Sequence, residues 1–410
     1  MVTVLNNPPK LLPIKIVSAL TFILIADNSI GLRIAQAVSF NIQSNGATSQ
    51  QALDAFTTAS QPWSSRLQDD VVINLNIGFE RLNSSVLGTT LPVEVKYSYD
   101  AVLDALSRDV TSSNDAIATS SLQSTSAFDL LINYTSDNPN GYGSSTAYLD
   151  NDGSKNNRQI RITSANAKSL GLQSNTGQDG SITFNSDINW DFIPEDGIAT
   201  GAFDFISVAT HEIGHALGFI SGVDLLDQYS PFQVNRNEFY FPEDTFAGVS
   251  TLDLFRFSDE SVAYGDGVID WTAGSNPKYF SIDGGQTPLG NFSTGTFNGD
   301  GKATSHWKNG QNLGIMDPDI RTGESLSISS LDLLAFDVIG WDVERSSSRS
   351  HVNGQFLGSS NLTLPSSPVN LDVAESVPEP GFGKGILLFG VLGLSKLIRR
   401  CQLNAASSVG

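Results

Sequence analysis

Apolar and polar side chains alternate along several short stretches, which is the pattern of β-strands with one buried face. The clearest stretch runs from Val71 to Phe79, where every second residue is apolar. Further strands are predicted at 160–163, 180–185 and 188–192.

A different periodicity, between 202 and 219, predicts a helix with one buried face. Gly218 is placed to end or bend this helix. Weaker patterns predict helices at 49–56, closed by Gln61-Pro62, and at 99–106, 121–131 and 330–339, with Trp341 packed at the end of the last. In the 202–219 helix the apolar residues recur at intervals of three and four: Ile206, Ala209, Ile213, Ala216 and Ile220.

The first 37 residues have the parts of a secretory signal peptide. Lys10 and Lys15 precede an apolar run from Ile16 to Ala26, and Ala35-Gln36-Ala37 offers small residues before a cleavage point at Val38. A short buried strand or helix is the alternative. We therefore expect an exported protein.

The C-terminal end carries three parts of a sorting signal. Val377-Pro378-Glu379-Pro380 comes first, then an apolar stretch from Gly385 to Leu394, then Lys396, Arg399 and Arg400. This order resembles the PEP-CTERM signal of exported Gram-negative and cyanobacterial proteins, which implies an exosortase-type processing enzyme as partner. An ordinary C-terminal membrane anchor is the alternative. Either one places the protein at the cell envelope or outside it, anchored transiently or stably.

Between these ends the chain is strongly acidic. From Val38 to Pro380 there are 16 Lys or Arg against 42 Asp or Glu, which argues against nucleic acid or anionic membrane surfaces as partners. The one cysteine, Cys401, lies beyond this segment. Core burial and metals, and not disulfides, must therefore stabilise the exported segment.

The helix at 202–219 contains His211-Glu212-Ile213-Gly214-His215, which has the spacing of a zinc site. Histidines four positions apart project from one side of a helix. Both can bind zinc, and Glu212 can act as general base toward a zinc-activated water. Two histidines on an ordinary buried helix are the alternative, but only four histidines occur in the chain.

A catalytic zinc needs a third protein ligand and an open position. The short spacing His-Glu-x-x-His-x-x-Gly-x-x-His would put the third ligand at Ser221, and serine is a poor zinc ligand. Asp224 and Asp227 lie close by but outside that spacing. Glu238 or Glu243 would need a following helix, which their surroundings do not predict.

His306 is the remaining candidate for the third ligand. It follows His215 by 91 positions, stands next to Trp307 and precedes Met316 by ten. Met316 is the one methionine besides the initiator, and a lone methionine is usually a gap-filler in a core. The fourth histidine, His351, lies in a Ser-rich stretch beyond the last predicted helix.

The motif formed by these residues, with its spacing, resembles that of the leishmanolysin-type metzincins. In that family a long insertion follows His-Glu-x-x-His-Ala-Leu-Gly-Phe, the third histidine returns in a Ser-His-Trp-Lys-like segment, and a Met-turn comes next. His211, Glu212, His215, His306 and Met316 fall on the family's positions. The match covers 210–219 and 305–318. The family's disulfides have no counterpart in the exported segment.

The resemblance implies an α+β zincin core with a mixed twisted sheet, an active-site helix, a large insertion and a C-terminal subdomain. Met316 would lie beneath the metal as a structural floor. An antiparallel edge strand before the active-site helix would bind the peptide substrate by adding it to the sheet. The candidate for that strand is Ile182, Thr183, Phe184 and Asn185, with an ordinary sheet strand as the alternative.

Two polar loops carry oxygen ligands of the kind that calcium prefers. Asp150-Asn151-Asp152-Gly153-Ser154 and Asn298-Gly299-Asp300-Gly301 place such ligands at alternate positions, without the glycine and distal glutamate of an EF-hand. Solvated acidic loops are the alternative for both.

Together these features predict a secreted zinc endopeptidase that acts on peptide or protein substrates. Two other functions stay open: an envelope or adhesive protein that keeps the fold, and a zinc amidase acting on cell-wall peptide. The expected domains are a signal peptide at 1–37, a protease domain at 38–345, a linker at 346–376, the sorting segment at 377–401 and a tail at 402–410. Within the protease domain we expect the insertion at 221–303 and the third ligand and Met-turn at 304–318.

Overall fold

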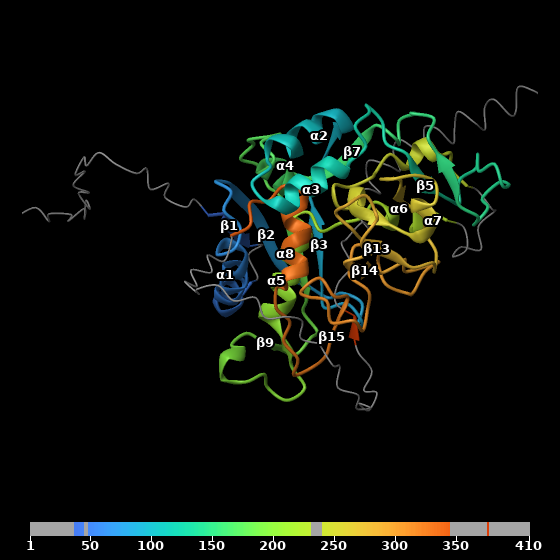
Figure 1. Ribbon diagram of the computed structural model, residues 1–410. Helices are drawn as coiled ribbons and strands as arrows, with labels where there is room; N and C mark the ends of the chain where they lie inside the picture. The colour runs from blue at the N-terminus through green and yellow to red at the C-terminus, as the bar shows by residue number, and fades with distance from the viewer. Residues whose placement is uncertain (1–36, 45–47, 231–239, 345–374, 377–410) are drawn as a thin grey trace, which may run out of the picture. The chain divides into compact units, whose positions relative to one another are not determined.

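The computed structural model describes residues 37–44, 48–230, 240–344 and 375–376 (Figure 1). The predicted signal peptide up to residue 36, the sorting segment, the tail and all but the last two residues of the predicted linker lie outside this part of the chain. Within it, no helix combines the length and apolar character that a membrane crossing needs.

A four-stranded mixed sheet forms the base of the fold. It consists of β1 (Ser39–Ser44), β2 (Val72–Glu80), β8 (Gly180–Asn185) and β3 (Gly88–Pro92), in that order. The first three strands run parallel, and β3 is antiparallel to β8. Alternate apolar side chains of β2 and β8 are buried on one face, as their period of two predicts.

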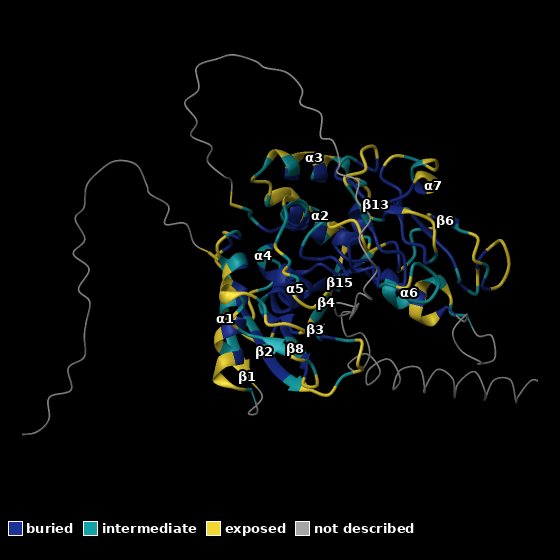
Figure 2. Ribbon diagram, turned by 90° about the horizontal axis from the view of Figure 1, so that it is seen from below, coloured by how far each residue is buried: buried dark blue, intermediate teal, exposed yellow. Residues whose placement is uncertain are grey.

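Two helices pack together against the sheet, α1 (Gln50–Ser64) and α5 (Phe205–Leu217). The Trp63 indole N–H of α1 donates to the Thr210 carbonyl at 2.9 Å, and the Thr210 hydroxyl donates to the Ala59 carbonyl at 3.1 Å. Figure 2 shows α5 as buried and α1 as exposed on its outer side. The expected end of α1 before Pro62 is wrong, because burial of Trp63 carries the helix one turn further.

Between β3 and α5 the chain forms several further short elements besides β8. They are β4 (Glu94–Ser98), α2 (Tyr99–Arg108), α3 (Ser113–Ser121), β5 (Leu130–Ile132), β6 (Tyr148–Asp150), β7 (Gln159–Thr163), α4 (Ser164–Ser169), β9 (Trp190–Asp191), a 3-10 turn (Pro194–Asp196) and β10 (Phe203–Asp204). The helix expected at 121–131 is wrong. Ser112 and Asp115 form a capping box that starts α3 earlier, and the apolar residues 130–132 pair as a strand with β6.

The segment between α5 and His306 forms short helices and strands, and one of these strands pairs with a strand from before α5. It contains α6 (Val223–Tyr229), 3-10 turns at Glu243–Phe246 and Leu252–Phe255, β11 (Arg256–Phe257), α7 (Asp259–Val262), β12 (Ile269–Asp270), β13 (Lys278–Phe280) and β14 (Gly290–Phe292). β12 pairs in parallel with β5, which precedes α5 in the chain. After it come β15 (Asp319–Ile320), α8 (Ser330–Val338) and β16 (Glu375–Ser376), which pairs with β15.

The predicted substrate strand is wrong in its placement. Ile182, Thr183, Phe184 and Asn185 lie in β8, which pairs with β2 on one side and β3 on the other. Because both of its backbone edges are used, β8 cannot accept a further strand. In the described part of the sheet the edge nearest α5 belongs to β3, and Pro92, which lacks an N–H, is compatible with an edge strand.

A cluster of carboxylates lies where the segment that follows α1 meets the chain around residue 342. Leu67 and Val343 form an isolated β-bridge, and the Asp342 N–H donates to Asp69 Oδ2 at 3.0 Å. Burial, then repulsion from Asp342 and Asp109, raises the pKa of Asp69 to about 8. Burial and neighbouring carboxylates also raise the pKa of Asp109 to about 7.

These raised pKa values predict that the protein loses stability as the pH rises from about 4 to about 8. The folded chain keeps a proton on Asp69 that the unfolded chain has already lost, so the stabilisation is complete below the unfolded pKa and disappears above the folded one. Asp69→Asn should flatten this slope in urea unfolding of chelator-treated protein. The exposed neighbour Asp70 gives the control Asp70→Asn. A wild-type slope retained in Asp69→Asn would contradict the assignment.

Candidate functional site

Helix α5 brings His211 and His215 into the core. The Asp204 carboxylate caps its start by accepting from the Ile206 N–H at 2.9 Å. The buried face that the periodicity predicts is present, but burial extends all round the helix from Ser207 to Leu217. Neither histidine side chain is exposed to solvent.

Gly218 ends the helix and orients His215 at the same time. Its φ of 128° lies in the left-handed region that favours glycine. The chain therefore turns back, the Phe219 N–H bonds the Gly214 carbonyl at 3.1 Å, and the Phe219 carbonyl lies 2.7 Å from His215 Nδ1. A carbonyl can only accept, so Nδ1 carries the proton and Nε2 has its lone pair available.

The segment 313–318 lies directly against the zinc-motif helix. The Ile315 carbonyl lies 2.6 Å from His211 Nδ1 and fixes that ring in the same tautomer. Met316 is fully buried, and a Cβ added at Gly214 would come within 2.5 Å of its sulfur. Only a glycine at position 214, the fourth residue of the motif, allows Met316 to pack so close.

His306 reaches the same place from the far end of the insertion. Its segment runs antiparallel beside β14, with the Ser293 N–H donating to the His306 carbonyl at 3.0 Å and the Lys308 N–H donating to Asn291 at 2.7 Å. His306 is fully buried, and its Nδ1 lies 3.2 Å from the Ala303 carbonyl.

Asp224 holds the segment that carries His306. Its carboxylate accepts from the N–H and hydroxyl of Thr304, at 2.5 and 2.8 Å, and from the N–H and hydroxyl of Ser305. Ser305 in turn accepts from the Ser221 N–H at 2.8 Å. The start of the insertion is thereby tied to its end.

The other candidates for third ligand have different partners. The Ser221 hydroxyl donates to Asp253 Oδ1 at 2.6 Å, and Asp227 accepts from the N–H groups of Phe297 and Asn298 at 2.8 and 2.9 Å. Glu243 lies with Asp150 and Asp152, and Glu238 is outside the described residues.

The three histidines form a donor set that fits a zinc ion. Their side-chain nitrogens lie within 4.8 Å of one another, with Nε2 of His215 at 3.0 Å from Nε2 of His211 and 3.3 Å from Nε2 of His306. Since each Nδ1 faces a carbonyl, three lone pairs converge in a buried space. Converging lone pairs repel one another unless a cation lies among them, and neutral imidazoles are zinc ligands.

Glu212 is fully buried beside this donor set. Burial raises the pKa of its carboxyl well above the ordinary value, and a hydrogen bond from Thr90 opposes that rise. Thr90 donates to Oε2, whereas Oε1 has no hydrogen-bond partner in the described part of the chain. The side chain therefore has one oxygen fixed and one available.

Sequence reasoning missed Asp332, which supports both Trp307 and the Met316 segment. Its carboxylate accepts from the Trp307 indole N–H at 2.7 Å and from the Ile315 N–H at 2.8 Å. Trp341 is buried just after the last helix, where its backbone N–H bonds the Phe336 carbonyl at 3.1 Å, and its indole N–H also donates to the Leu217 carbonyl at the end of α5. An aspartate or tryptophan partner far away in the chain leaves no local pattern that could reveal it.

One of the two predicted calcium loops forms a carboxylate cluster. Asp150, Asp152 and Glu243 have ligand oxygens within 4.8 Å of one another. In the other loop, Asp300 pairs with Lys308 at 2.6 Å. An ion pair already neutralises that carboxylate, which argues against calcium there.

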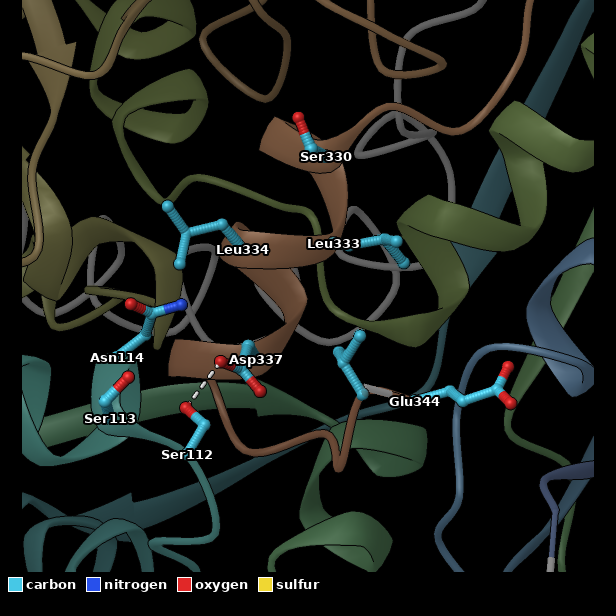
Figure 3. A pocket seen from close by; sticks show the side chains of 9 residues that line it. Ser112, Ser113, Asn114, Ser330, Leu333, Leu334, Asp337 and Glu344 are labelled. Atoms are coloured by element: carbon cyan, nitrogen blue, oxygen red, sulfur yellow. Dashed lines mark hydrogen bonds between the residues drawn. The ribbon is translucent and has the colours of Figure 1, made fainter. Parts of the chain in front are cut away.

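A pocket of about 420 Å³ lies between α3 and α8 (Figure 3). The Ser112 hydroxyl donates to Asp337 there at 2.8 Å. None of the three histidines lines the pocket, nor does Glu212. Its lining is Ser112, Ser113, Asn114, Ser330, Leu333, Leu334, Asp337, Val343 and Glu344.

Asp224→Asn should weaken zinc binding while the fold is kept. Loss of the charged acceptor loosens Thr304 and Ser305, so the zinc dissociation constant should rise roughly 10- to 100-fold. Competition with a chelator measures this. The control is Asp227→Asn on the same helix, since its partners lie before the His306 segment. Equal zinc affinity in the two variants would refute the role of Asp224.

Comparison with protein families finds that residues 152–252 match the matrixins, Peptidase_M10. The matched segment includes α5 with both of its histidines and ends before His306. No curated protein and no solved structure matches the chain. Residues 152–252 are thus similar to the zinc protease domain of the matrixins, the fold brings a buried triad of histidines together, and the chain is a zinc-dependent endopeptidase.

Proposed function

We propose that His211, His215 and His306 bind the zinc ion and that Glu212 is the general base for hydrolysis of peptide bonds. The observation that carries this assignment is the convergence of three buried imidazoles, each with Nδ1 held by a backbone carbonyl. These backbone contacts orient the three rings toward one another, and ligands oriented by such contacts suit a catalytic metal centre.

The chain's own groups account for the proton transfers. When bound, zinc polarises the scissile carbonyl and acidifies a water molecule. Glu212 Oε1, which has no hydrogen-bond partner among the described residues, takes a proton from the water as the water oxygen attacks the carbonyl carbon. As the C–N bond breaks, the same oxygen gives that proton to the leaving nitrogen.

The long interval between His215 and His306 supports a leishmanolysin-like ligand arrangement within the metzincins. Ser221 stands where the short spacing would put the third ligand, and its hydroxyl is directed to Asp253. Met316, packed against Gly214, is the proposed structural floor beneath the metal.

The proposed substrate site is the edge of β3. The peptide would add to the sheet as an extra strand beside Glu212, which β3 contacts through Thr90. Leu91 and Val93 are 39% and 40% exposed, so apolar side chains flank this edge. They favour a protein substrate with apolar residues near the cleaved bond.

Export and sorting are proposed from the two chain ends. The N-terminal signal implies secretion, and the Pro-Glu-Pro segment with its basic end implies an exosortase-type partner and a membrane-associated stage. Calcium is proposed as a structural ion for the cluster of Asp150, Asp152 and Glu243, where burial raises the pKa of Glu243 to about 7.

Two variants separate the proposed roles of Glu212 and His306. Glu212→Gln should keep zinc and lose about 100-fold or more in casein cleavage, because it removes the base and leaves the ligands in place. His306→Ala should lose both zinc and cleavage.

The control is His351→Ala, outside the described residues, which should leave both properties unchanged. Full zinc content and activity in His306→Ala would overturn the ligand assignment. An amidase would instead release products from cell-wall peptide and leave casein intact, and an adhesive protein would cleave neither.

A further inference from the structure

Thr90 on β3 makes two contacts with Glu212. Its hydroxyl lies 2.9 Å from the Glu212 backbone carbonyl and also donates to Oε2 of the side chain. Thr90 has no exposed surface, so water does not compete for these contacts. The hydroxyl joins the sheet to both the backbone and the side chain of the same helical residue.

Gly88, two residues earlier on the same face of β3, determines the space around the other carboxylate oxygen. A Cβ at this position would lie 3.2 Å from Glu212 Oε1 and 3.2 Å from Cδ1 of Phe184. Since the Phe184 ring is packed in the core, the carboxylate would have to move. β3 therefore fixes Oε2 through Thr90 and leaves room for Oε1 through Gly88.

The backbone of Thr90 faces the open edge of the sheet. The Asn185 N–H donates to Leu87 and the Val93 N–H donates to Asp179, at the two ends of the β3–β8 pairing. Backbone groups alternate in an antiparallel pair, so Leu87, Thr89, Leu91 and Val93 bond toward β8. The N–H and C=O of Thr90 then point away from β8, where an added strand would pair.

We propose that Thr90 is a positioning residue that fixes the Glu212 carboxylate and couples it to the strand edge that receives the peptide substrate. This inference rests on the proposed role of Glu212. The side chain of Thr90 holds one carboxylate oxygen and so directs the other toward the attacking water. Its backbone sets the register of the substrate strand relative to that oxygen.

Steady-state kinetics of Thr90→Val and Thr90→Ser test the positioning role. Valine keeps the shape and removes the hydroxyl, so kcat should fall roughly 10- to 100-fold while KM and zinc content stay unchanged. Serine restores the hydroxyl and should recover most of kcat. Gly88→Ala, which crowds Oε1 from the other side, should also lower kcat at full zinc content.

The matched control is Thr251→Val. Thr251 is also buried, and its hydroxyl donates to Asn166 Oδ1 at 2.8 Å and not to Glu212. Thr251→Val therefore removes one buried hydroxyl hydrogen bond and should leave kcat unchanged.

A second readout uses metal-free protein and needs no activity. In chelator-treated protein, Thr90→Val and Glu212→Gln should destabilise the fold by less together than the sum of their separate effects, because each removes the same hydrogen bond. Strictly additive effects would show that the two side chains do not interact.

The outcomes separate this inference from the proposed function. Wild-type kcat in Thr90→Val, with Glu212→Gln inactive, overturns the role of Thr90 and leaves the base assignment intact. Activity in Glu212→Gln would overturn both. If Thr90→Val does not fold, Thr90→Ser provides the test. Serine keeps the hydroxyl donor, so its kcat should stay well above that of a folded Gly88→Ala variant. An equally low kcat in the two variants would contradict the proposal.

Discussion

The convergence of three imidazole Nε2 atoms in a buried space is the constraint on which the rest of the structure depends. Lone pairs packed this closely must be held against their mutual repulsion before a cation arrives. Three backbone carbonyls, those of Phe219, Ile315 and Ala303, orient the rings from behind. Each carbonyl belongs to a different part of the chain, so the site forms only when the helix end, the Met316 segment and the His306 segment are all in place.

The insertion explains how a distant histidine can complete the site. Asp224 at its start bonds Thr304 and Ser305 at its end, and β12 pairs with β5 outside the insertion. Asp332 fixes Trp307 and the Met316 segment from α8. Asp224, a candidate third ligand by sequence, therefore acts through hydrogen bonds to the His306 segment.

The sequence predicted the helix of the zinc motif, β2, β7 and β8 because each has a strong local period. It also singled out His306, since few histidines were available and Met316 followed at a suggestive distance. The helix predicted at 121–131 was wrong, because a capping box starts α3 earlier and strand pairing makes residues 130–132 part of β5.

The sequence also failed to predict the substrate edge. Strand order depends on pairing between segments about 100 residues apart, such as Thr90 with Ile182, and no local pattern encodes that choice. For the same reason the roles of Thr90 and Asp332 could not be predicted, since their partners lie far along the chain.

The most direct test of the account is X-ray absorption spectroscopy at the zinc edge of the zinc-loaded protein. We expect three imidazole nitrogens at about 2.0–2.1 Å, and two after His306→Ala in whatever zinc that variant retains. A spectrum with two imidazoles and a carboxylate in the wild type, unchanged by His306→Ala, would contradict the central claim that the distant histidine completes the metal site.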